Sequence, residues 1–169
     1  KHLAENKVQE AQQKFSELKN KYPHLTCHFI GHLQTNKVKA ALKACDVIQS
    51  VDSLKLAQEI EKQAEKLGRA ANILVQVKIS GEEQKFGADP AQALQLIEEI
   101  SKLQRIRILG LMTMAPTPQR GSESRLPQSD TTQRRDAVIE NEKEIRQCFK
   151  QLRKIYDEAA KEFQDSPNV

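Results

Sequence analysis

Apolar residues recur along this chain with two alternating spacings, and the alternation predicts strands joined by helices. Intervals of three and four residues predict helices over 7–20, 36–45, 53–67 and 90–103. Short apolar or alternating runs predict strands over 26–31, 47–51, 72–80 and 106–113. Strands that alternate with helices pair in parallel through right-handed crossovers, so the pattern predicts an α/β fold. The residues alone leave open whether the sheet is doubly wound or part of a barrel.

The segment from 115 to 130 interrupts this order. It carries three prolines and a glycine among polar residues, which predicts a mobile loop. A long helix is predicted after it, because apolar residues between Val138 and Phe163 mostly repeat at intervals of three and four. A chain of 169 residues usually forms one domain, so we expect a single domain over 1–169.

Composition and charge exclude several classes of protein. The net charge of +4 is mild and does not require a polyanionic partner. No apolar run approaches membrane-spanning length, and there is no signal-peptide pattern. Cys27, Cys45 and Cys148 lie far apart and are odd in number, which argues against a disulfide framework or a zinc site. We therefore expect a cytoplasmic protein, with mitochondrial association left open.

Polar side chains gather where the predicted strand that contains His28 ends at Gly31 and the next helix begins near Asn36. Ligands of α/β folds sit at this carboxyl edge, so His32, Gln34 and Asn36 are candidate site residues by position. Asn36 also suits a helix cap, and His28 also suits a packed, hydrogen-bonded role on a strand.

The amino-acid sequence of this junction is also specific. The segment HFIGHLQTNK, residues 28–37, resembles the pyridoxal-phosphate homeostasis family, whose barrel is related to the amino-terminal domain of alanine racemase. Further segments resemble the same family in the expected order: ENKVQE at 5–10, QSVD at 49–52, VKISGEEQK at 77–85, IRILGLM at 106–112 and FKQLR at 149–153. The resemblance implies a partial (β/α)8 TIM barrel of the alanine racemase amino-terminal type, with about four complete strands in this chain.

The resemblance also implies a cofactor and a set of residues that bind it. The cofactor is pyridoxal 5'-phosphate, and the matching positions are Asn6, His28, Asn36, Ser80, Lys85 and Met112. The Schiff-base lysine and the phosphate-binding segments of the family are expected outside residues 1–169, so the chain is expected to be a central fragment that lacks the first and last strands of the barrel.

Each matched residue has a simpler alternative. Asn6 suits a helix cap, Met112 suits a core position, and Lys85 suits an exposed loop. In the family's pocket, Lys85 would bind phosphate as a point charge or accept the aldehyde. Lys78 departs from the family, which usually has Asn there, and strand alternation places Lys78 opposite Val77. Lys78 is thus either a snorkelling lysine or an amine inside the barrel.

The resemblance implies that the protein binds, buffers and delivers pyridoxal phosphate without turnover. No catalytic residues are therefore expected. The expected partner is the small-molecule cofactor, and no membrane, nucleic acid or metal is expected. The sequence leaves the oligomeric state open and favours a monomer. One rival is an amino-acid racemase or decarboxylase on the same barrel. Racemization needs an acid–base pair at the substrate, and Tyr22 and Tyr156 both fall on predicted helices or their ends, away from the strand tips. The other rival is a basic nucleic-acid or protein-binding module, which has little aromatic support.

Overall fold

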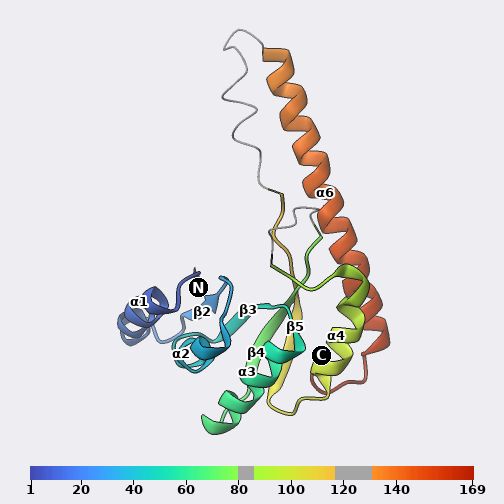
Figure 1. The fold of residues 1–169 in the computed structure, drawn as a ribbon. Helices are drawn as coiled ribbons and strands as arrows, with labels where there is room; N and C mark the ends of the chain where they lie inside the picture. Colours follow the sequence, from blue (N-terminus) through green and yellow to red (C-terminus); the bar gives the residue numbers. More distant parts are fainter. Residues whose placement is uncertain (80–85, 117–130) are drawn as a thin grey trace.

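The computed structural model describes residues 1–79, 86–116 and 131–169, and for 131–140 only the backbone. Five strands form one parallel sheet in the order of the chain (Figure 1). They are β1 (His2–Glu5), β2 (Thr26–Phe29), β3 (Val47–Val51), β4 (Ala71–Gln76) and β5 (Ile106–Met112). The expectation of about four strands was wrong by one, because the four residues of β1 are too few and too mixed to show a period.

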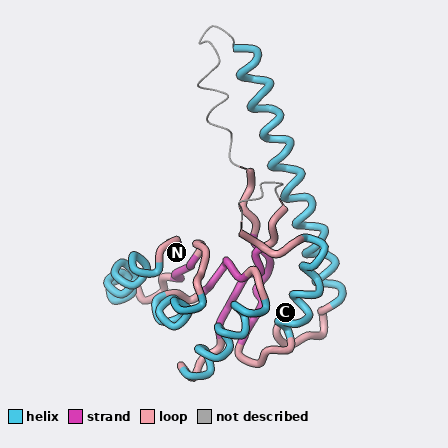
Figure 2. Tube along the Cα trace, viewed as in Figure 1, coloured by secondary structure: helices cyan, strands magenta, loops and turns pink. Residues whose placement is uncertain are grey.

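Helices connect the strands and pack against one another in sequence. They are α1 (Val8–Lys21), α2 (Val38–Ala44), α3 (Leu54–Lys66), α4 (Ala93–Ser101) and α6 (Thr131–Glu162), with 3₁₀ turns η1 (Thr35–Lys37) and η2 (Pro90–Gln92) before α2 and α4. Each helix contacts the next in the order α1, α2, α3, α4, α6, so the helices lie on one side of the sheet (Figure 2). A doubly wound sheet carries helices on both faces and reverses its strand order, so this arrangement is that of a barrel segment.

The register of the sheet aligns the carboxyl ends of the strands. Glu5 pairs with Phe29, and Phe29 pairs with Ile48. Farther along, Val51 pairs with Val75, and Gln76 pairs with Met112. The residues that follow the strands therefore share one edge, and this carboxyl edge is where the candidate site was predicted.

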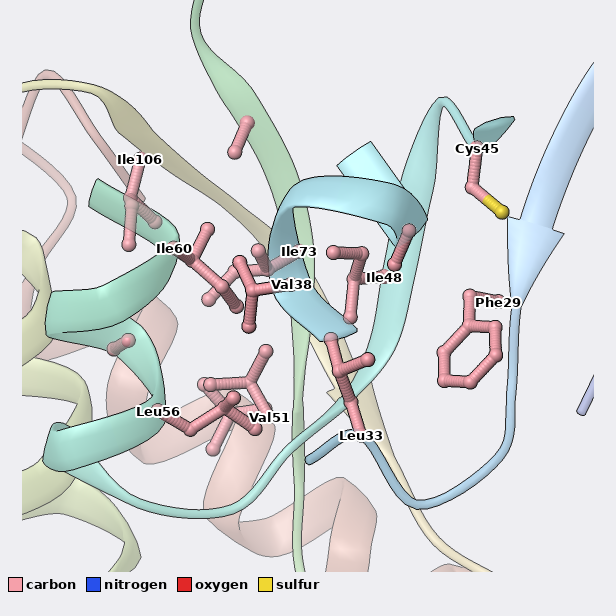
Figure 3. Packing of buried hydrophobic residues seen from close by; sticks show 14 of the residues in the cluster. Phe29, Leu33, Val38, Cys45, Ile48, Val51, Leu56, Ile60, Ile73 and Ile106 are labelled. Atoms are coloured by element: carbon pink, nitrogen blue, oxygen red, sulfur yellow. The ribbon is translucent and has the colours of Figure 1, made fainter. Parts of the chain in front are cut away.

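Burial of apolar side chains between sheet and helices holds the fold together. Phe29, Ile48 and Ile73 point from the sheet toward the helices and are at most 1% exposed (Figure 3). Ile60 of α3 and Val38 of α2 pack against them. Each such side chain contributes about 1.5–3 kcal/mol when it leaves water. The strand and helix periods of the sequence therefore meet in one shared core.

Some local expectations need correction. Asn6 does not cap α1: the N-cap is Lys7, and no side chain bonds the helix end. The strand predicted over 26–31 ends at Phe29, and the helix predicted from Asn36 begins instead as the 3₁₀ turn η1. The loop predicted over 115–130 lies outside the described residues except for 115 and 116.

In the described part of the chain, no helix combines the length and apolar character that crossing a bilayer requires.

Candidate functional site

The exits of β1 and β2 lie in direct contact at the carboxyl edge. The Ile30 N–H donates to the Glu5 carbonyl at 3.0 Å, which extends the strand ladder by one step. A Cβ at Gly31 would overlap the carbonyl group of Asn6, so only glycine permits this close approach. Gly31 thereby places exposed Asn6 beside the loop that carries His32.

A second cluster joins the loop after β2 to the segment before η2. The rings of His32 and Phe86 stack with centroids 3.8 Å apart and an interplanar angle of 15°. His32 Nδ1 lies 4.0 Å from Asp52 Oδ2, and Asp52 directly follows β3. An imidazole, a carboxylate and an exposed aromatic ring therefore meet above the end of β3.

Phe86 is held in place through its backbone. Gln76, which is 3% exposed, donates from Nε2 to the Phe86 carbonyl at 2.8 Å. Ala88 pairs with β4 through two backbone bonds, one of which runs from the Lys78 N–H to the Ala88 carbonyl at 2.9 Å. Gly87 between them has a φ of +139°, and a Cβ there would lie 2.7 Å from the Lys78 nitrogen. The segment 86–88 is thus built tightly onto the end of β4.

The ends of β4 and β5 are also joined. The Val77 N–H donates to the Met112 carbonyl at 2.9 Å, and the Thr113 hydroxyl donates to the Val77 carbonyl at 2.8 Å. Met112 is half-buried and pairs with Gln76. Val77 is buried in the core that the sheet shares with the helices, so Lys78 starts from the opposite side of the strand. Lys78 is half-buried.

His28 lies below the edge, in the middle of β2. Its neighbours Cys27 and Phe29 are buried toward the helices, so His28 faces the other side of the sheet. Both of its ring nitrogens are engaged: Nε2 lies 2.9 Å from His2 Nδ1, and Gln49 Nε2 lies 2.7 Å from Nδ1. Burial, followed by the nearby His2, lowers the pKa of His28 below its ordinary value.

The structure therefore brings together only some of the residues predicted from the sequence. Asn6 and Met112 lie at the carboxyl edge but on the two outer strands of the five. Asn36 is exposed within η1, and His28 lies deeper on the sheet. Ser80 and Lys85 are outside the described residues.

Sequence reasoning did not single out Asp52 or Phe86 as site residues, nor His2 or Gln49. The position of Asp52 at the carboxyl edge could have been predicted, because Asp52 directly follows the predicted strand 47–51. The other three depend on contacts between distant segments. In the described part of the chain, no three His, Cys, Asp or Glu side chains converge as metal ligands.

Comparison with protein families gives a match over nearly the whole chain. The family model described as "Alanine racemase, N-terminal domain" matches residues 1–164. The chain is 35% identical over 159 residues to a curated protein of Aquifex aeolicus named pyridoxal phosphate homeostasis protein, a match that covers 94% of this chain and 60% of that protein. The match with the same-named protein of Helicobacter pylori is 35% identical and covers 92% of this chain and 61% of that protein.

Solved structures give the same picture. PipY of Synechococcus elongatus, whose structure has PLP bound, superposes with a TM-score of 0.71 and 32% identity over 98% of this chain and 65% of that one. A crystal structure described as an unknown protein from Bifidobacterium adolescentis superposes with a TM-score of 0.77 and 29% identity over 95% of this chain and 60% of that one. The chain thus spans roughly three fifths of its relatives' length. The shared fold confirms the predicted α/β class and the partial barrel.

Proposed function

Because the chain belongs to the alanine racemase N-terminal domain family, we propose that its protein binds pyridoxal 5'-phosphate and buffers or delivers this cofactor without turning over a substrate. Two findings support the proposal. Curated relatives carry the name pyridoxal phosphate homeostasis protein, and PipY has PLP bound. We also propose a cytoplasmic location, because three widely spaced cysteines without a pairing pattern suit a reducing compartment.

One observation carries the proposal within this chain: polar groups converge at the carboxyl edge of a barrel segment. The edge presents the Asn6 amide, the His32 imidazole beside Asp52, and the Thr113 hydroxyl near Met112. Pyridoxal phosphate offers matching partners, namely a ring nitrogen, a phenolic oxygen and a phosphate. Ligands of barrels bind at this edge, so position and donor chemistry agree.

Four residues have distinct proposed roles. Asn6 would donate to an oxygen of the cofactor, and Met112 would pack against its ring. His28, with both nitrogens already bonded, would form the wall beneath the cofactor. Asn36 would order the loop that carries His32.

Ser80 and Lys85 stay in the proposed site because of the family motif. Lys85 would bind the phosphate as a point charge. When bound, the cofactor supplies an aldehyde carbon and an electron-withdrawing ring. The chain's own residues would orient it and limit the access of water.

We favour a carrier over a racemase because the curated relatives are named homeostasis proteins and because both tyrosines lie away from the carboxyl edge. Racemization needs a proton donor and an acceptor on opposite sides of the substrate carbon. In the described residues, Tyr22 ends α1 near the amino end of the sheet, and Tyr156 lies on α6. The likeness to alanine racemase of Clostridium difficile is 22% identical and concerns the fold.

Titration of the full-length protein with pyridoxal phosphate, followed by visible absorbance, tests the proposal. We expect saturable binding, and we expect Asn6→Ala to weaken it by about tenfold, the cost of one hydrogen bond to a charged group. Asn20→Ala is the matched control, because Asn20 is an exposed residue of α1. Wild-type protein that does not bind would refute the proposal, and turnover of an amino acid by the loaded protein would favour the racemase or decarboxylase.

A further inference from the structure

We infer that His2, His28 and Gln49 form an acid-sensitive clamp that ties β1, β2 and β3 together on the face of the sheet opposite the helices. The three side chains come from three neighbouring strands. His28 stands in the middle, with one ring nitrogen toward each partner. The His2 and His28 rings lie 5.2 Å apart between centroids and are tilted by 46°, so they meet through their nitrogens and not by stacking.

The donors and acceptors of the clamp follow from its geometry. Gln49 Nε2 belongs to an amide NH₂ and can only donate, so His28 Nδ1 accepts. Neutral His28 then carries its proton on Nε2 and donates it to His2 Nδ1. The order of donation runs from Gln49 through His28 to His2, and it requires both imidazoles to be neutral.

Acid removes this order in two stages. A first proton on His28 Nδ1 would face the Gln49 NH₂, and the amide must turn so that its oxygen accepts. The bond to His2 survives, because Nε2–H of His28 still donates. A second proton, on His2 Nδ1, would set two N–H groups of like charge against each other only 2.9 Å apart. Protonation of His28 therefore weakens the link to Gln49, and protonation of both rings also opens the link to His2.

The surroundings favour the closed, neutral state. The half-buried position of His28, and His2 on β1, both lower the pKa of His28. Asp46, in the turn before β3, acts in the opposite direction more weakly. Asp46 is itself paired with Lys19 of α1 at 2.7 Å, which offsets its charge. The strand residues in register with His28 are Ala4 and Val47, and neither titrates.

The direction of the His28 pKa shift sets how the stability contributed by the clamp depends on pH. The folded protein binds protons at His28 less readily than the unfolded chain does, since its pKa lies below the ordinary value of 6.5. The stability contributed by the clamp is thus complete above pH 6.5 and is lost as the pH falls through the lowered pKa. β1 leads directly to Asn6, so, given the proposed function, opening the clamp would also loosen the cofactor site.

The test combines imidazole NMR titration of the full-length protein with hydrogen exchange of β1 and β2, both without cofactor. Between pH 7.5 and 5, we expect exchange in the 1–6 and 26–31 segments to rise beyond the intrinsic change, because protonation of His28 Nδ1 turns it from an acceptor into a donor facing the Gln49 NH₂. Cofactor affinity, measured separately, should fall over the same range. A protein that binds no cofactor would refute the proposed function but leave the exchange result to judge the clamp.

Two variants make the result decisive. Gln49→Glu places a carboxylate at His28 Nδ1, which raises the pKa of His28. This variant should reverse the pH dependence of exchange, so that β1 is protected better at pH 5 than in wild type. His2→Phe removes the acceptor of the His28 Nε2–H bond, so exchange in β1 should be fast at both pH values and the profile should be flat. His24→Phe, an exposed loop histidine, is the matched control and should behave as wild type. A wild-type profile in Gln49→Glu and His2→Phe would overturn the clamp, as would a wild-type protein whose exchange does not respond to acid.

Discussion

Different kinds of interaction stabilise the two faces of the sheet. The face toward the helices carries Phe29, Ile48 and Ile73, which are stabilised by the non-directional burial of apolar surface. The opposite face carries His28, Gln49 and Gln76, which are stabilised by directional hydrogen bonds to specific partners. The first face should therefore dominate the free energy of unfolding, and the second should decide the geometry at the carboxyl edge.

Ile73→Ala should show the largest effect on stability. Ile73 is fully buried on the helix-facing side, so truncation leaves a cavity and should cost about 2–5 kcal/mol in the free energy of unfolding. Urea denaturation of the full-length protein measures it. Ile73→Val should cost only about 0.5–1.5 kcal/mol. Equal losses from the two variants would contradict the burial argument.

Gly31→Ala should combine a loss of stability with a loss of ligand binding. The added Cβ overlaps the Asn6 carbonyl group, so the exits of β1 and β2 must separate. Overpacking of this kind costs about 1–3 kcal/mol. Thermal unfolding and cofactor titration should both change. Gly68→Ala is a useful contrast, since the space around Gly68 is open although its φ is +64°: it should lose stability without loss of cofactor affinity.

Gln76→Leu should cost less than either. It keeps most of the side-chain volume but removes the donor to the Phe86 carbonyl, a loss of about 1 kcal/mol or somewhat more. The expected signature is local: faster hydrogen exchange in the 86–88 segment, with little change in the helices. Uniformly faster exchange across all helices would mean that Gln76 supports the whole core instead.

His32→Ala should have the smallest effect on stability. It removes an exposed stack on Phe86, worth about 0.5–1.5 kcal/mol. His32→Phe keeps the stack and should restore stability, while losing the contact with Asp52. Denaturation of both variants and their cofactor affinities separate stacking from polar contact. Equal loss of stability in the two variants would contradict the stacking role.

The same comparison explains what the sequence predicted and what it could not. Apolar period is a local signal, so the bounds of β3 and the extent of α1 and α3 agree closely with prediction. The polar face depends on register between strands. His2 meets His28 across 26 residues, and His32 meets Phe86 across 54, and no local pattern encodes either meeting.

For the predicted site, position along strands was the reliable part. Asn6 and Met112 lie at the carboxyl edge because each ends or follows a strand. His28 was predicted from motif resemblance, and its two hydrogen bonds depend on strand register, which the motif does not contain. The predicted roles of Ser80 and Lys85 remain predictions, since both lie outside the described residues.

A crystal structure of the full-length protein grown with pyridoxal phosphate tests the central claim most directly. The account predicts density for the pyridine ring at the carboxyl edge, bordered by Asn6, Met112 and the His32 loop, with the ring above His28. Cofactor density at the amino end of the sheet, for example beside Leu3 and Tyr22, would contradict it.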